Sequence, residues 1–540
     1  MSQRTKGYEK CILLLVGTCI YIIFSLLIKP LRSPLRHLPS PNQGSVWLRL
    51  LHEPRVPEIE KWMDTLPHCG LIRYHGIFNR ERLFVASPKA AKDLLTTSAY
   101  KSIKPELQWL LANNIAGEGL LIQEGEAHKQ ARKRFNPIFS PARMKEWFPS
   151  LWHTTIEAIE ALPQQTEETS LRLAGDSLDK PREGVTSILK LVSAASIDMI
   201  GHFGFNVNFN TLKSIGPQKR EVAAASQDPT VKFGRAYIGM FKTTKRGQLT
   251  LEAASIIGAK LALKLPIPAV RTIDGIMGLV RQTAEHIVVG HKQALVSDEG
   301  GKLPKDDMLT SLTKTGHFSH GDLVEQTVHF LAAATETVAG SVCWAVHLLS
   351  RHPDVQAHLR DEVRENIPSP HDTTSEPVSD TQFRNLKYLN AVVQEVLRYH
   401  SINTLLWREF VEPATIAGVL IPTHTSIVFS PWALNRDPAH WGPDARCFVP
   451  ERWLDDPSGG ADHSYSFLTF GGGPRRCVGE QYARDELLCM IAGLIGRYEF
   501  TPIAPQMGTD EGQEIGDNFA LTLFKIMEGW KLNVKEIPGW

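Results

Sequence analysis

The chain has 540 residues, of which 42% are hydrophobic and 22% are charged, and its formal net charge is +1. This length exceeds one ordinary small core and no long low-complexity tract divides it, so we expect one large enzyme domain with an appendage. The near-zero net charge excludes the global basic field of many nucleic-acid-binding proteins, and no nucleic-acid partner is expected. The seven cysteines are scattered and odd in number, which argues against a disulfide framework and indicates a reducing compartment for the catalytic part.

The N-terminal part of the chain contains an apolar run over residues 11–28 without a charged side chain. As a helix, the run would span about 27 Å at 1.5 Å per residue, which is enough for a thin bilayer. A cleaved signal peptide is the alternative, but the run is long and no small-x-small cleavage site follows it. We therefore predict a transmembrane anchor over residues 1–29.

A basic and proline-rich stretch over residues 30–41 follows the apolar run. Its prolines favour a stiff, extended linker, so the main domain is predicted to span residues 42–540. Basic residues flank the apolar run on both sides. The positive-inside rule therefore gives only a slight preference for a cytoplasmic domain.

The main domain is predicted to begin with a β-hairpin over residues 70–86, with its turn near Asn79. Residues 150–300 have mostly helical patterns and carry no motif that indicates chemistry.

Residues 125–135 have the pattern of a basic helix. His128 and Arg132 are four residues apart on it, so they share one face. Taken alone, these two side chains most simply form part of a solvated basic face.

Residues 321–349 are predicted to form one long apolar helix, and its centre carries Glu336 and Thr337. An acid and an alcohol in apolar surroundings cost desolvation energy unless they are used or hydrogen-bonded. The simplest structural interpretation is a threonine hydroxyl that bonds to the preceding turn and a glutamate that reaches solvent.

An amphipathic helix is predicted over residues 388–399, where Glu395 and Arg398 meet on one face. By itself this pair is typical of a helix surface. Downstream, Arg452 lies in the sequence Pro-Glu-Arg-Trp, which ends at Trp453.

Between these two motifs, residues 415–430 suggest a further hairpin, with Arg408 on its approach.

Residues 467–480, with the sequence FLTFGGGPRRCVGE, carry the most specific signal. Three glycines and a proline cannot continue a helix or a regular strand, and a helical run begins near Glu480. A helix N-terminus favours a thiolate at Cys477 over a thiol, and Arg475 and Arg476 are expected to act in the same direction.

The simplest alternative for Cys477 is a small buried hydrophobic side chain. A zinc site would need a second ligand at short spacing, and no other Cys or His lies within ten residues. A lone thiolate flanked by arginines suits a metal whose remaining ligands come from a cofactor, and the arginines would face carboxylates of that cofactor.

The pattern Phe470-x-x-Gly473-x-Arg475-x-Cys477-x-Gly479 resembles the heme-binding loop of the cytochrome P-450 family of heme-thiolate monooxygenases. The order of the acid–alcohol helix, Glu-x-x-Arg, Pro-x-Arg and the cysteine loop agrees with that family from about residue 40 to the C-terminus. The resemblance implies a mainly α fold with small β-sheets, the cytochrome P-450 fold, in addition to the N-terminal transmembrane helix.

The resemblance makes Cys477 the axial ligand of the iron in heme b (iron protoporphyrin IX). It implies that further side chains contact the heme, with a histidine in place of the commoner tryptophan. These side chains are Phe470, Arg475, Arg408, His128 and Arg132.

On the other side of the heme, the resemblance makes Glu336 and Thr337 the acid–alcohol pair that delivers protons for dioxygen activation. The chain departs from the family pattern at two positions that flank this pair. Ala334 stands in place of a glycine, and Val338 stands in place of a second hydroxyl residue.

A structural clamp behind the heme is also implied by the resemblance, consisting of Glu395, Arg398 and Arg452. Trp453 stands where the family has a phenylalanine.

The implied co-substrates are O2 and NADPH-derived electrons. Because the chain has no glycine-rich flavin or nicotinamide fingerprint, the implied partner is an NADPH-dependent flavoprotein reductase. Family members with such an anchor usually lie on the cytosolic face of the endoplasmic reticulum membrane, held by a single transmembrane pass.

The resemblance also implies a largely apolar substrate pocket. Its expected lining comprises residues 109–116, Phe330, Ala333, residues 402–406 and residues 519–522. A lipophilic substrate such as a terpenoid, polyketide or fatty-acid-like molecule fits that lining, and the chain resembles fungal members that tailor secondary metabolites.

The implied function is therefore a heme-dependent monooxygenase. Two alternatives remain open at this point: a heme-thiolate isomerase or dehydratase that does not use O2, and a non-catalytic heme-binding sensor. The Glu336–Thr337 pair argues against the first, and a complete proton relay on a membrane anchor would be unusual for the second.

Overall fold

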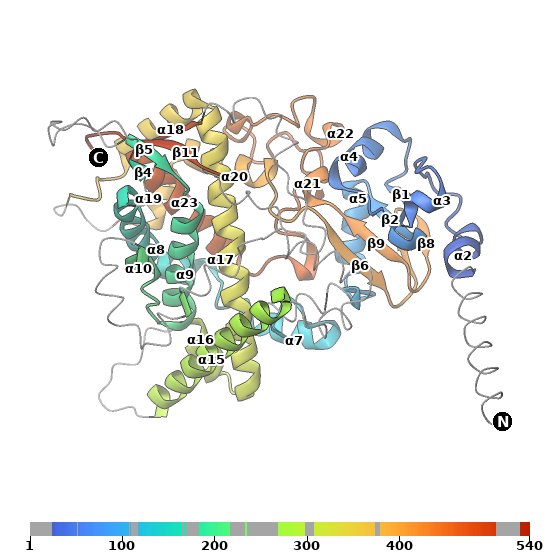
Figure 1. The fold of residues 1–540 in the computed structure, drawn as a ribbon, viewed down its shortest axis with the longest axis horizontal. Helices are drawn as coiled ribbons and strands as arrows, with labels where there is room; N and C mark the ends of the chain where they lie inside the picture. Colours follow the sequence, from blue (N-terminus) through green and yellow to red (C-terminus); the bar gives the residue numbers. More distant parts are fainter. Residues whose placement is uncertain are drawn as a thin grey trace. The chain divides into compact units, whose positions relative to one another are not determined.

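The computed structural model describes residues 24–50, 52–106, 109, 117–164, 167–168, 183–215, 233–234, 268–296, 307–372, 378–503 and 530–540. These residues are mainly helical, with three small sheets (Figure 1). They form two compact units, each assembled from segments that are distant in the sequence. The first unit contains residues 1–105, 404–434 and 463–475, and the second contains residues 106–403, 435–462 and 476–540.

The first unit is built on a five-stranded sheet with the order β1-β2-β9-β6-β3. Only the β2–β9 pair is parallel. The strands are β1 (Leu71–Gly76), β2 (Arg80–Val85), β3 (Ser102–Ile103), β6 (Leu406–Phe410) and β9 (Ser426–Phe429).

The predicted first hairpin is confirmed, with Leu71 opposite Val85 at its open end. Its turn is the short 3-10 helix η2 (Ile77–Asn79), in which Phe78 and Asn79 have φ angles of 59° and 52°. Asparagine tolerates this left-handed region better than most residues, which is why the turn falls there.

The hairpin predicted over residues 415–430 is shorter in the structure. It consists of β7 (Ala414–Ile416) and β8 (Val419–Ile421), joined at Ala417 and Gly418, which both have positive φ angles. The later residues instead form β9, which joins the five-stranded sheet between β2 and β6. A hairpin is therefore present, but its predicted extent was wrong because alternating strand patterns do not reveal which partner a strand pairs with.

Short helical segments complete the first unit. They are η1 (Phe24–Ile28), α2 (Lys29–Leu31), α3 (Val46–Arg49), α4 (Val56–Thr65), α5 (Pro88–Lys92), η3 (Asp93–Thr97), α21 (Pro431–Leu434), η6 (Ser464–Ser466) and η7 (Gly473–Arg475).

The second unit contains the long helices together with several shorter ones. They are α7 (Gly125–Phe135), α8 (Pro141–Ala161), α9 (Leu189–Phe205), α10 (Thr211–Ile215), α15 (Pro268–Val296), α16 (Met308–Lys314), α17 (His320–Arg351), α18 (Pro353–Asn366), α19 (Asp380–Asn385), α20 (Lys387–Tyr399) and α23 (Glu480–Arg497), with the short α22 (Pro438–Trp441), η4 (Leu162–Gln164) and η5 (Pro450–Trp453). Its sheet has the order β10-β11-β5-β4, with β10 (Tyr498–Pro502), β11 (Leu532–Glu536), β5 (Glu183–Thr186) and β4 (Glu167–Glu168).

Helix α17 is the central element of the second unit, and it packs against α9, α15 and α23 (Figure 1). It begins with a capping box in which Ser319 and Asp322 satisfy each other's backbone N–H groups. The predicted long apolar helix is therefore confirmed, and so are the predicted helices at α7, α20 and α23.

The predicted transmembrane anchor lies mostly outside the described residues, since only residues 24–29 of it belong to them. Among the helices that the structure describes, none combines the length and the apolar character needed to cross a bilayer.

Helix α23 buries an acid against α9. The Glu486 side chain is fully buried, and the Ser196 hydroxyl donates a 2.6 Å hydrogen bond to its Oε1 atom. Burial raises the pKa of the Glu486 carboxyl to about 8, although hydrogen bonds from Ser196 and Tyr482 act in the opposite direction. The folded protein therefore carries this group as a neutral acid near pH 7.

This raised pKa predicts that the contribution of Glu486 to the free energy of unfolding falls as the pH rises from about 5 to 8. Between the unfolded pKa of about 4.3 and the folded value, the folded state holds the extra proton, so each rise in pH favours the unfolded chain. Glu486→Gln keeps a neutral side chain at every pH. Its free energy of unfolding relative to wild type should rise across this range by an amount on the order of a few kcal/mol.

Urea denaturation at pH 5 and pH 8 measures this difference. Glu160→Gln, which changes an exposed acid on α8, is the control. Parallel pH profiles for wild type and Glu486→Gln would contradict the prediction.

Candidate active site

The cysteine of the glycine-rich loop lies directly before α23, as predicted. Gly479 is the N-cap of α23, and Cys477 precedes it by two residues with an exposed side chain. The loop is divided between the two units, because residues 463–475 belong to the first and Arg476 begins the last segment of the second.

The charge state predicted for Cys477 needs a correction. The burial of the sulfur by surrounding protein raises the pKa of the thiol, and the Glu480 carboxylate adds to this rise. The Gly479 N–H group and the cations Arg132 and Arg476 lower this pKa, as the helix N-terminus and the arginines were expected to do. Their combined effect is smaller than that of burial and Glu480, so the net shift of the pKa is upward. The residue is exposed, but its thiol still loses hydration to the surrounding protein, so the thiol is the favoured form until a cation binds it.

Arg132 on α7 lies beside the cysteine loop within the second unit. Its guanidinium donates to the backbone carbonyl of Arg476, and its Nε donates to Asn136 Oδ1 at 2.7 Å. His128, one turn earlier, is only 4% exposed. A wholly solvated basic face is therefore wrong for this helix, because one of its two side chains points into the protein and the other reaches the loop.

The other half of the loop is pressed against η3 within the first unit. Gly473 has a φ angle of +62°, and a Cβ atom there would lie 2.0 Å from the Leu95 carbonyl oxygen. Since no side chain tolerates this contact, the glycine permits the approach. Arg475 follows with its guanidinium 5.1 Å from the Tyr100 ring centre, and Phe470 is half-buried nearby in the sequence.

Arg408 lies inside strand β6 of the first unit, where its guanidinium donates to the Trp407 carbonyl at 2.9 Å. The structure thus brings Arg408, Phe470 and Arg475 into one unit and His128, Arg132 and Cys477 into the other.

The acid–alcohol pair lies at the middle of α17, and both side chains are half-buried. The Thr337 hydroxyl donates to the Ala333 carbonyl at 2.8 Å, which is the back-bond that the simplest interpretation expected. Thr335 makes the same bond to Leu331 and is fully buried on another face. A hydroxyl that donates its proton in this way can still accept hydrogen bonds through its oxygen lone pairs.

Some predicted pocket residues are described and others are not. Phe330 is buried, with its ring 4.9 Å from that of Phe135. Ile402 packs on α17 so closely that a Cβ atom at Gly340 would lie 2.7 Å from its Cδ1 atom. Of residues 109–116 only Trp109 is described, and residues 519–522 lie outside the described part of the chain.

The three predicted clamp residues come together in the second unit. Arg398 and Glu395 have no exposed surface and form a bidentate pair, with N–O distances of 2.8 and 2.7 Å. Arg452 donates to Glu395 Oε1 at 3.3 Å. The pair is therefore a buried ion pair and not the surface pair that the helix pattern alone suggested.

Arg398 also supports irregular backbone. Its guanidinium donates to the carbonyls of Asn435, Ala445 and Cys447 at 2.9, 2.6 and 2.8 Å. Such a charge-assisted donor satisfies carbonyls that have no helix or sheet partner.

Trp453 is a clamp member that sequence reasoning missed. Its indole N–H donates to Glu395 Oε2 at 2.8 Å, a bond that the phenylalanine of the family pattern cannot make. The signal was present in the sequence, because an indole has a hydrogen-bond donor and a phenyl ring has none.

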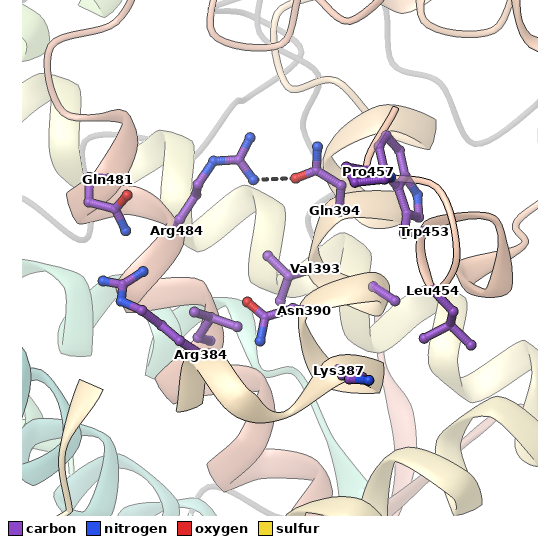
Figure 2. Close-up of a pocket in the computed structure, with 12 residues that line it drawn as sticks. Arg384, Lys387, Asn390, Val393, Gln394, Trp453, Leu454, Pro457, Gln481 and Arg484 are labelled. Atoms are coloured by element: carbon purple, nitrogen blue, oxygen red, sulfur yellow. Dashed lines mark hydrogen bonds between the residues drawn. The ribbon is translucent and has the colours of Figure 1, made fainter. Parts of the chain in front are cut away.

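A cavity of about 430 Å³ lies beside the clamp, with Trp453 in its wall (Figure 2). The Arg484 guanidinium donates to the Gln394 amide oxygen across this cavity. Carboxylates hold its arginines, with Arg484 3.2 Å from Glu480 and Arg384 3.1 Å from Asp485. None of the predicted heme contacts lines the cavity, so it is separate from them.

Comparisons with known proteins point to one family. The sequence profile described as cytochrome P-450 matches residues 68–516. The chain is 31% identical to cytochrome P-450 monooxygenase sphH of Aspergillus fumigatus, over 96% of this chain and 93% of that protein. It is 29% identical to cytochrome P-450 monooxygenase FSL4 of Gibberella zeae, over 94% and 90%, and 29% identical to cytochrome P-450 monooxygenase buaD of Petromyces alliaceus, over 96% and 92%.

The residues around Cys477 fit a heme. Among the described residues, no group of three or more His, Cys, Asp or Glu side chains could hold a metal ion. The Cys477 sulfur supplies one soft ligand. Arg132, next to the loop, supplies a cation of the kind that pairs with carboxylates.

The Trp453 bond predicts a measurable stabilisation. Trp453→Phe keeps an aromatic ring but removes one donor from a fully buried carboxylate, so we expect a loss of about 1–3 kcal/mol in the free energy of unfolding. Urea denaturation measures the loss. Trp62→Phe, the same change at a tryptophan that packs on Tyr74, is the control, and equal effects of the two substitutions would show that the hydrogen bond contributes nothing.

Proposed function

Because the chain belongs to the cytochrome P-450 family, we propose that it inserts one oxygen atom of O2 into a lipophilic small molecule, such as a terpenoid or polyketide, as a tailoring step of secondary-metabolite biosynthesis. The single observation that carries this proposal is the exposed Cys477 at the start of α23, with Arg132 bound to the loop beside it. The relatives are named monooxygenases, which favours this function over a heme-thiolate isomerase, a dehydratase or a heme sensor.

The residues predicted to contact the heme would hold it. Cys477 would bind its iron, and basic side chains would pair with its carboxylates. These side chains are His128, Arg132, Arg408 and Arg475, with Phe470 packing near the ring. When bound, heme b supplies the iron centre for dioxygen chemistry, and a thiolate ligand favours cleavage of the O–O bond.

Glu336 and Thr337 would manage protons. Because the Thr337 hydroxyl donates to the Ala333 carbonyl, its oxygen is oriented as an acceptor that can hold a water molecule. Glu336, half-buried one residue earlier, would pass protons from solvent to that water.

Electrons would come from outside the chain, through an NADPH-dependent flavoprotein reductase, since the sequence has no nucleotide-binding fingerprint of its own. Residues 1–29 would form a single transmembrane helix, and the catalytic part would lie on the cytosolic side of the endoplasmic reticulum membrane. The length and apolar character of residues 11–28 support a membrane-spanning helix.

Cys477→His tests the iron ligand. The reduced carbon monoxide complex of wild type should absorb at the position of thiolate-ligated heme, and that of the variant at the position of histidine-ligated heme. Cys69→Ser removes another exposed cysteine and serves as the control. A variant with the wild-type spectrum would rule out Cys477 as the ligand.

Thr337→Ala tests the proton pathway. Product formed per NADPH should fall and hydrogen peroxide should rise, because proton delivery of this kind typically contributes about 10²–10⁴-fold to rate. The substrate is first identified by comparing metabolite extracts of strains with and without this protein. Thr335→Ala is the matched control, since Thr335 makes the same back-bond on a different face. If Thr337→Ala forms as much product per NADPH as wild type, Thr337 has no role in proton delivery and only bonds to the Ala333 carbonyl of its own helix.

Truncation tests the anchor. Deletion of residues 1–23 should release the protein from membranes and leave heme binding intact. A longer deletion of residues 1–28 should also retain heme but lower stability, because the Asn79 side chain donates to the Leu26 carbonyl. Membrane fractionation and heme absorbance are the measurements. A shorter form that stays with membranes would contradict the anchor, and loss of heme would show that these residues belong to the catalytic fold.

A further inference from the structure

The chain makes a tight turn just before α7. The backbone N–H groups of Ile122 and Gln123 donate to the Gly119 carbonyl at 2.9 and 3.1 Å, which closes the turn. The side chains of Leu120 and Ile122 are buried. The turn is therefore an ordered structure, although it is irregular backbone.

Three other N–H groups of this turn donate to side chains of α17. The pairs are Glu118 N to Glu325 Oε2 at 2.8 Å, Leu120 N to Gln326 Oε1 at 3.1 Å, and Leu121 N to His329 Nε2 at 3.3 Å. We call Glu325, Gln326 and His329 the α17 clip. It satisfies backbone donors that would otherwise need water or another partner.

Two glycines allow the turn to approach α17. A Cβ atom at Gly119 would lie 2.3 Å from His329 Cβ, and one at Gly117 would lie 2.5 Å from Glu325 Oε2. Gly117 also has a φ angle of +68°, where other residues are strained. The turn thus carries glycines where it approaches α17 closely, and α17 carries hydrogen-bond acceptors where the turn presents N–H groups.

The clip is itself held in place. The Arg281 guanidinium of α15 donates to Glu325 Oε1, the oxygen that the turn does not use. His329 is only 4% exposed, and its ring centre lies 5.3 Å from that of Phe330. Because Nε2 accepts a hydrogen bond from an N–H group, the ring is neutral with its proton on Nδ1.

We propose that the α17 clip is a positioning device that sets the turn of residues 117–123, and with it the start of α7, relative to the proton-delivering pair on the same helix. The turn leads directly into α7, and Glu336 follows His329 by seven residues, or about two helical turns. Helix α17 therefore carries both the side chains that hold the turn and the pair Glu336–Thr337. This inference rests on the proposed function.

The first test is hydrogen exchange of the heme-loaded protein. Gln326→Leu and His329→Phe remove acceptors, so amide exchange in the peptide of residues 117–123 should become about tenfold faster. Thr327→Val is the matched control, because its hydroxyl is buried on the same helix but bonds to the Leu323 carbonyl. Unchanged protection in both acceptor variants would overturn the proposal.

The second test separates positioning from stability. Imidazole and the bulky azole clotrimazole are titrated while the Soret band is followed. In the acceptor variants, clotrimazole should bind about tenfold more weakly because the turn is no longer held in one position on α17, whereas the small imidazole should bind as in wild type. Equal changes for the two probes, or none, would contradict a positioning role.

Gly119→Ala tests the same contact from the turn and leaves α17 unchanged. Its Cβ atom should displace the turn and reproduce both effects of the acceptor variants. If it leaves exchange and clotrimazole binding at wild-type values, the proposal is overturned. These outcomes are distinct from failure of the proposed function, which a wild-type protein without a thiolate-type carbon monoxide spectrum would reveal.

Discussion

The buried carboxylate of Glu395 is the group on which the second unit depends most. It accepts hydrogen bonds from Arg398, Arg452, Trp453 and the Val449 N–H group, although it has no exposed surface. An isolated carboxylate in such a place would be very costly, and removal of one partner from a buried pair is strongly destabilising. The donors therefore fix α20 to the segment around η5, and Arg398 extends the same network to backbone carbonyls before that segment.

The cysteine loop shows a balance of opposing electrostatic effects. The helix N-terminus and the cations Arg132 and Arg476 lower the pKa of Cys477. Loss of hydration and the Glu480 carboxylate raise it by more, so the net shift is upward. Glu480 in turn pairs with Arg476 and Arg484, so much of the positive charge near the sulfur is already compensated. A bound metal deprotonates a coordinating thiol outright, and the loop therefore does not need to hold a free thiolate in advance.

Helix α17 combines several roles because it is long and runs through the second unit (Figure 1). Its first turns accept hydrogen bonds from the turn before α7, and its middle carries Glu336 and Thr337. A regular helix transmits position over such a distance because every backbone bond is internal to it. Groups that must keep a fixed separation are therefore best carried on one helix.

The sequence by itself determined the local elements and the motifs. The period of 3.6 residues predicted α7, α17, α20 and α23, and the first hairpin followed from strand alternation and a turn at Asn79. The pattern of the cysteine loop by itself indicated the family. Only the tertiary structure decided the second hairpin, the burial of the Glu395–Arg398 pair, the bond from Trp453 and the net direction of the Cys477 pKa. The physical reason is that strand pairing, desolvation and donor geometry depend on residues far apart in the sequence, and spacing along the chain carries no information about them.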